Sequence, residues 1–201
     1  MTIYEDYASW KKENYDFIIQ LIKAESKTIS RFTSVIAVVD YLYEQYMKDP
    51  ILSEEENIFF STGFDYIHDN FYTIKTILDY QFQGDFKEME KYAKTINLLL
   101  YVHEFQSELL NADLDIKNEM SMLDDFEEKI NSHLDKKENI PDAFFPMLND
   151  IVDPIFRRHG LSFTPIESIF YEVALEYGIY KNNEIDMYNT VFNLQKNKNK
   201  H

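Results

Sequence analysis

The chain has 201 residues, of which 45% are hydrophobic and 16% aromatic, and its formal net charge is -16. This content of apolar side chains is enough for a folded core, which excludes an intrinsically disordered acidic chain. The negative charge disfavours direct binding to nucleic acid or to an anionic membrane, because like charges repel. Cysteine is absent, so disulfides, thiolate metal sites and cysteine nucleophiles are excluded as well.

The N-terminal residues carry charges throughout and lack the apolar run of a signal peptide. No later segment offers about 18 uninterrupted apolar residues, the length that a membrane-spanning helix needs. We therefore expect a cytoplasmic protein that does not enter a membrane.

Apolar residues recur at steps of three and four along most of the chain, which is the spacing of one face of an α-helix. This pattern predicts an all-α protein without a sheet. The first five expected helices cover residues 3–23, 26–47, 53–84, 85–111 and 113–134. Gly63 is the weak point of the third helix, because a glycine inside a helix costs about 1 kcal/mol relative to alanine.

Prolines interrupt the pattern in residues 139–154, which we expect to break into short or kinked helical pieces. Thr164, Pro165 and Glu167 then combine an N-cap, a proline at the first helical position and a capping-box acid. They predict a helix that ends at Gly178. A final helix is expected over residues 183–195.

These elements make seven or eight helices, and their unequal lengths favour an irregular antiparallel bundle over an array of repeats. Residues 1–195 are expected to form a single helical domain. Any internal boundary is expected within residues 139–154, and residues 196–201 are expected to form a disordered tail.

Signatures of common catalytic sites are missing from the sequence. It contains neither a glycine-rich phosphate loop nor the nucleophile elbow of hydrolases. Helical di-iron enzymes place Glu three residues before His on two helices, and the nearest match here is the single pair Asp65 and His68. We therefore expect no cofactor and no tightly bound metal, and we favour binding over catalysis.

His103 falls on the apolar stripe of the expected helix over residues 85–111. The simplest interpretation is a core histidine that is hydrogen-bonded to a neighbouring helix. An alternative function remains open, in which the protein is a helical enzyme or small-ligand binder. Its aromatic-lined pocket would then lie near His68 or His103.

The negative charge is concentrated between Glu54 and Asp153, where 23 Asp and Glu stand against 8 Lys. A segment of this kind suits a cationic partner, and the abundant Tyr and Phe suit a protein interface. We expect an acidic interaction module, namely an inhibitor or immunity-type protein that neutralises a basic nuclease or other nucleic-acid-binding partner. The expected partner-binding residues are Asp113, Asp115, Glu119, Asp124, Asp125, Glu127 and Glu128.

Overall fold

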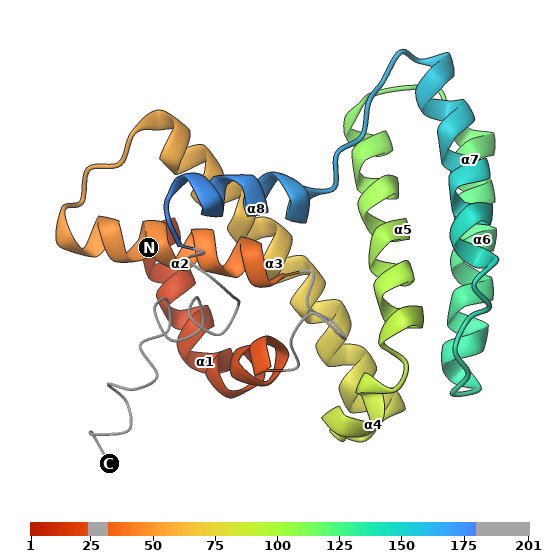
Figure 1. Cartoon of the computed structure of the whole chain (residues 1–201), viewed down its shortest axis with the longest axis horizontal. Coiled ribbons are helices and arrows are strands. Elements are labelled where there is room, and N and C mark those ends of the chain that lie inside the picture. The colour runs from red at the N-terminus through yellow and green to blue at the C-terminus, as the bar shows by residue number, and fades with distance from the viewer. Residues whose placement is uncertain (24–31, 180–201) are drawn as a thin grey trace. The chain divides into compact units, whose positions relative to one another are not determined.

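The computed structural model describes residues 1–23 and 32–179. Within these residues the chain forms eight α-helices and no strand, which confirms the all-α prediction (Figure 1). The expected helix over residues 183–195, the expected tail, and residues 26–31 of the expected helix over residues 26–47 lie outside the described residues. The helices are α1 (Ile3–Lys23), α2 (Thr33–Lys48), α3 (Glu54–Gln81), α4 (Phe86–Glu90), α5 (Ala93–Asn111), α6 (Lys117–Asp135), α7 (Phe144–Arg158) and α8 (Ile166–Glu176).

The chain divides into two compact units. Unit 1 contains Met1–Tyr72 and the chain from Ile166 onward, whereas unit 2 contains Thr73–Pro165. Helix α3 contributes its first part to unit 1 and its last residues to unit 2. The proline-rich residues 139–154 lie inside unit 2, and the single domain over residues 1–195 stays a prediction.

Unit 1 is built around aromatic side chains. The fully buried ring of Tyr7 on α1 has its centroid 5.5 Å from those of both Phe60 and Phe64 on α3. The ring of Trp10 packs edge-on against Phe71, with the two centroids 5.0 Å apart. Edge-to-face pairs of this kind are favourable for aromatic rings, so α1 and α3 are held together through them.

Gly63 marks a close approach of helices in unit 1. A Cβ atom at this position would lie 2.5 Å from Cγ2 of Val39 on α2 and 2.8 Å from Cε1 of Phe170 on α8. Real Cβ atoms are not found at such distances from other side chains. The glycine therefore lets α3 come close to α2 and α8, and this contact offsets its low helix propensity.

Unit 2 is a set of helices in which α5 packs against both α6 and α7 (Figure 1). Its core comes from the stripes that the sequence pattern predicts. Helix α6 buries one residue on each successive turn, namely Leu123, Phe126, Ile130 and Leu134.

The structure corrects three of the expected helix bounds. Residues 85–111 form two helices, because the N–H groups of Lys91 and Tyr92 bond to carbonyls three residues back rather than four. The helix expected from residue 113 begins at Lys117. Residues 139–154 do not break into pieces, since most of them belong to the continuous helix α7.

The prolines of α7 explain why that helix survives. Pro146 is its third residue, and the N–H groups of a first helical turn have no partner within the helix in any case. Pro154 lies farther inside and removes one hydrogen bond. The residues that follow it, Ile155 and Phe156, are buried, so tertiary packing holds the last turn in place.

Candidate functional site

The acids of α6 lie in two different environments. Asp124, Asp125 and Glu128 are exposed and lie opposite the buried stripe of the helix, as does Asp135 at its end. No described Lys or Arg forms an ion pair with any of these four carboxylates. We call Asp124, Asp125, Glu128 and Asp135 the outer acidic face.

Three of the expected partner-binding acids have partners inside unit 2. The exposed Asp124 accepts one hydrogen bond of 3.0 Å at its Oδ1 from Nε2 of Gln106, whereas Glu127 and Glu119 are more enclosed. Oε1 of Glu127 lies 2.9 Å from Nε2 of His103, and its Oε2 accepts a hydrogen bond of 3.0 Å from Nε2 of Gln106. Glu119, whose side chain is only 16% exposed, pairs with Arg158 at the end of α7. Glu119 and Glu127 join helices to one another, so they are poorly placed to meet another molecule.

Asp113 and Asp115 are exposed but do not belong to α6. They lie in the connection between α5 and α6, where Asp113 adopts a left-handed backbone with φ of 51°. Asp tolerates this conformation better than most residues do. The seven acids expected from the sequence therefore do not share one face, and Asp135, which was not among them, does join the outer acidic face.

The two histidines singled out by the sequence lie in different settings. His103 is hydrogen-bonded to Glu127 of the neighbouring helix, as predicted, although its side chain is 30% exposed rather than in the core. His68 is 60% exposed, and its Nδ1 lies 3.7 Å from the Asp69 carboxylate, beyond hydrogen-bond distance. Among residues 1–23 and 32–179, no three His, Asp or Glu side chains lie close enough to hold a metal ion.

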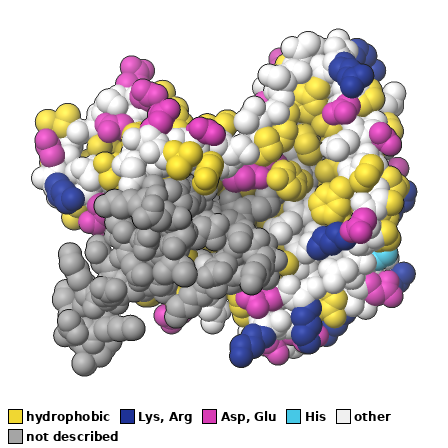
Figure 2. Space-filling model, viewed as in Figure 1, with side chains coloured by type: hydrophobic (Ala, Val, Ile, Leu, Met, Phe, Trp, Pro, Cys, Tyr) yellow, Lys and Arg dark blue, Asp and Glu magenta, His cyan; other side chains and the backbone are white. Residues whose placement is uncertain are grey.

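A pocket of about 570 Å³ opens between α5 and α7 in unit 2. Neither His68 nor His103 lines it. Figure 2 shows hydrophobic side chains gathered over these two helices on the visible face. Aromatic rings make up much of the lining, and they come from Tyr101, Phe105, Phe145, Phe156 and Phe163.

Three of these rings pack against one another in the wall of the pocket. The centroid of Phe163 lies 4.3 Å from that of Phe105 and 5.8 Å from that of Phe156. The polar part of the lining comes from Asn149 and Asp153, which are exposed and one turn apart on α7. The pocket thus combines an aromatic wall with a carboxylate at its edge.

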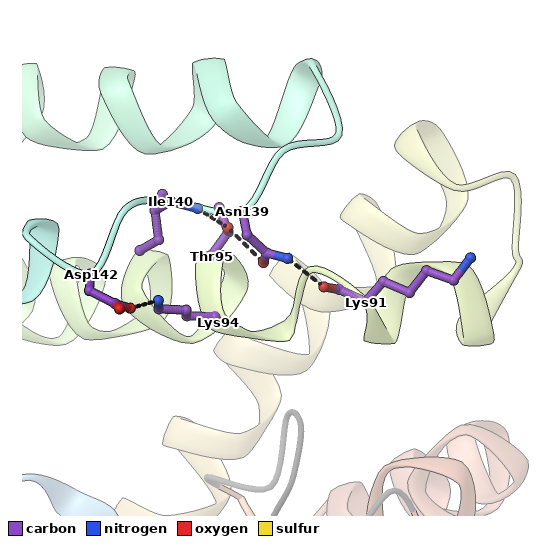
Figure 3. A network of polar contacts seen from close by, with 6 residues as sticks. All are labelled: Lys91, Lys94, Thr95, Asn139, Ile140 and Asp142. Carbon is purple, nitrogen blue, oxygen red and sulfur yellow. Dashed lines mark hydrogen bonds and ion pairs between the residues drawn. The ribbon is translucent and has the colours of Figure 1, made fainter.

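A polar network fixes the connection between α6 and α7 onto the start of α5 (Figure 3). The buried hydroxyl of Thr95 accepts a hydrogen bond of 3.0 Å from the N–H of Ile140. The side-chain amide of Asn139 donates to the carbonyl of Lys91 at 2.8 Å, and Lys94 forms an ion pair with Asp142. This network sets the start of α7 and hence the position of Phe145 in the pocket.

Replacing Thr95 with valine should lower the free energy of unfolding by about 2 kcal/mol. Valine has nearly the same shape but no hydroxyl, so the buried N–H of Ile140 loses its acceptor. Urea unfolding followed by circular dichroism gives the measurement. Thr62→Val, at an exposed position on α3, is the matched control and should change stability by less than about 0.5 kcal/mol. Equal losses in both variants would mean that this hydrogen bond does not stabilise the connection.

Unit 1 contains a fully buried carboxylate, that of Asp40 on α2. Its Oδ1 accepts hydrogen bonds from the Tyr7 hydroxyl at 2.7 Å and from Nζ of Lys11 at 2.6 Å. Oδ2 makes no hydrogen bond with a described residue. Burial raises the pKa of Asp40 above its ordinary value, although Lys11 and Tyr7 oppose that shift.

The sequence patterns did not identify the pocket or the buried carboxylate. A weak signal existed for Asp40, because it is the one acid among the otherwise hydrophobic residues 35–42. The pocket has no comparable signal, because its aromatic residues match the spacing of an ordinary core.

None of the helices in the described part of the chain has the length and apolar character to cross a bilayer. Comparison of the chain with protein-family models, with curated proteins and with solved structures finds no match.

Proposed function

We propose that this protein is an acidic helical interaction module that binds a basic protein partner through the outer acidic face. The observation that carries the proposal is the arrangement of four exposed carboxylates on one side of α6, none of them paired with a described Lys or Arg. A nuclease or another nucleic-acid-binding protein offers a basic surface of the kind required. The proposal therefore extends to a role as an inhibitor or immunity-type protein.

Rigidity strengthens this face as a binding surface. The opposite side of α6 is anchored by four buried apolar residues, and Glu119 and Glu127 tie the helix to α7 and α5. Charges held in fixed positions can steer an oppositely charged protein and raise its association rate at low salt by tens to hundreds of fold. Little side-chain and backbone order would have to be gained on binding.

Neutralising the outer acidic face should slow association with the partner by roughly tenfold or more at low salt. The variant carries Asp124→Asn, Asp125→Asn, Glu128→Gln and Asp135→Asn, and it leaves the paired Glu119 and Glu127 intact. The partner is first captured from the native cell with the wild-type protein. Association rates are then measured between about 0.05 and 0.5 M salt, over which the Debye length falls from about 14 Å to about 4 Å.

A second variant with the same change in net charge is the control. It replaces four exposed acids elsewhere by their amides, namely Asp65, Asp79, Glu172 and Glu176. This control should keep most of the association rate, because its charges lie outside the proposed surface. If both variants behaved like the wild type, or if both lost the same amount, the outer acidic face would act only through net charge and the proposal would be wrong.

A further inference from the structure

We infer that the pocket between α5 and α7 is a binding site for a small organic cation with an aromatic body, such as an arylalkylamine. This inference goes beyond the proposed function and does not depend on it. The pocket lies on α5 and α7, whereas the outer acidic face lies on α6, so the two sites use different residues.

The size and lining of the pocket suit a small molecule. Its volume of about 570 Å³ falls in the range of about 300–1,000 Å³ that is usual for ligand sites. Such sites are mostly apolar and carry a few polar groups that orient the ligand. Here Leu98, Leu148 and Val152 add aliphatic surface to the five aromatic rings, and Asn149 and Asp153 supply the polar groups.

The ligand's aromatic body follows from the rings in the wall. Phe105, Phe156 and Phe163 present faces and edges at different tilts, with interplanar angles of 41° to 57° among them. An aromatic guest can make offset or edge-to-face contacts with rings arranged in this way. Tyr101 adds a ring with a polar hydroxyl to the same wall.

The ligand's positive charge follows from the charges around the pocket. Asp153 is the acid in the lining, and no described Lys or Arg forms an ion pair with it. Nζ of Lys94 lies 5.8 Å from the centroid of Phe145 at another part of the lining, but Asp142 neutralises that lysine. Arg157 and Asp150 are also exposed on α7, but they carry opposite charges and neither of them lines the pocket.

Unit 2 as a whole favours a cation over an anion, since residues 73–165 contain 18 Asp and Glu against 10 Lys and Arg. Aromatic faces attract cations further through their negative electrostatic potential. A carboxylic acid of the same shape would meet Asp153 with like charge and would bind more weakly.

The test compares three probes by titration of the amide NMR spectrum of the full chain: 4-phenylbutylamine, 4-phenylbutanoate and n-butylamine. We expect 4-phenylbutylamine to bind saturably and to shift amide signals of α5 and α7. Its affinity should exceed that of each other probe by roughly tenfold, because 4-phenylbutanoate lacks the cation and n-butylamine lacks the ring. Equal affinities of the amine and the carboxylate, or the absence of saturable binding, would overturn the inference.

Two pairs of variants locate the site. Asp153→Asn should lower the affinity for 4-phenylbutylamine by roughly threefold, as expected for a partly exposed ion pair, whereas Asp150→Asn should leave that affinity unchanged. Asn149→Phe should fill part of the pocket with a bulky ring and abolish binding, whereas Met147→Phe, at an exposed position of α7 outside the lining, should leave binding intact. Identical behaviour within each pair would show that the amine binds elsewhere.

A last comparison separates a small molecule from a protein side chain. If N-acetyl-Lys-Trp-Lys-amide bound the same amides more tightly than 4-phenylbutylamine, the pocket would be a docking point for a basic protein, contrary to the inference. The variant that neutralises the outer acidic face should bind 4-phenylbutylamine as the wild type does. Slower partner association in this variant tests the proposed function, and saturable binding of the amine tests the present inference. Either one can therefore fail without the other.

Discussion

Replacing Asp40 with alanine should lower the free energy of unfolding of unit 1 by about 3 kcal/mol, because the pair that is broken has one fully buried partner and one, Lys11, that is 20% exposed. The Tyr7 hydroxyl, which is fully buried, would lose its acceptor, and the ammonium group of Lys11 would lose the carboxylate 2.6 Å away. Trp10 is the single tryptophan and lies in the same core, so its fluorescence during urea unfolding gives the measurement.

Asp65→Ala provides the comparison for this result. Asp65 is an exposed acid on the part of α3 that belongs to unit 1, so its removal should change stability by less than about 0.5 kcal/mol. A loss below about 1 kcal/mol for Asp40→Ala would contradict the prediction. It would mean that the cost of burying the charge nearly equals what its hydrogen bonds contribute.

The stability difference between the wild type and Asp40→Asn should depend on pH. Burial raises the pKa of Asp40 in the folded state, so the folded protein holds this proton more tightly than the unfolded chain does. The corresponding stability is fully present below the unfolded pKa of about 3.9 and is lost as the pH rises through the folded pKa. The free energy of unfolding of the wild type, measured relative to that of Asp40→Asn, should therefore rise as the pH falls from 7 to 4. A difference that stayed constant would contradict a raised pKa.

Asp40 also illustrates why part of the structure could not be predicted from the sequence. Helical spacing identifies which residues face a core, but it does not reveal that an acid on that face has a partner on another helix. Lys11 lies 29 positions earlier in the chain, and nothing in the local pattern connects the two residues. The pair is defined only by the way α1 packs against α2.

The helices themselves were predictable where their apolar stripes were long. Along α6, Leu123, Ile130 and Leu134 recur at helical spacing in the sequence, and all three are buried, whereas Met120 at the same spacing is only partly buried. The errors fall where backbone hydrogen bonds compete with the pattern, as at the break between α4 and α5, or where packing overrides a proline, as in α7. Spacing alone contains neither kind of information.

For the candidate site, the sequence identified the acidic helix but not the role of each acid. Composition and spacing predicted that Glu127 and Asp125 both bind the partner. In the structure Glu127 faces α5 and pairs with His103, whereas Asp125 is exposed. Their positions differ by 200° around the helix axis at about 100° per residue, and only the direction of the neighbouring helices decides which one is free to meet a partner.

The sign of the stability change in Gly63→Ala shows whether helix propensity or packing dominates at this position. Helix propensity alone predicts that Gly63→Ala raises stability by about 1 kcal/mol. The added Cβ, however, would lie 2.5 Å from Val39 and 2.8 Å from Phe170, and both of these side chains are buried at 0% and 1% exposure. Because neither can move into solvent without losing its packing, we expect Gly63→Ala to lower the free energy of unfolding by about 1 kcal/mol and Gly63→Leu by about 3 kcal/mol.

The measurement is again urea unfolding followed through the fluorescence of Trp10. Thr62→Ala is the matched control, since Thr62 is exposed on the adjacent position of α3 and gains helix propensity without a collision. It should raise stability by a few tenths of a kcal/mol. If Gly63→Ala also proved stabilising, α3 would not approach α2 and α8 as closely as the structure has it. If it destabilised while Thr62→Ala did not, the loss would come from the close packing of α3 against Val39 and Phe170.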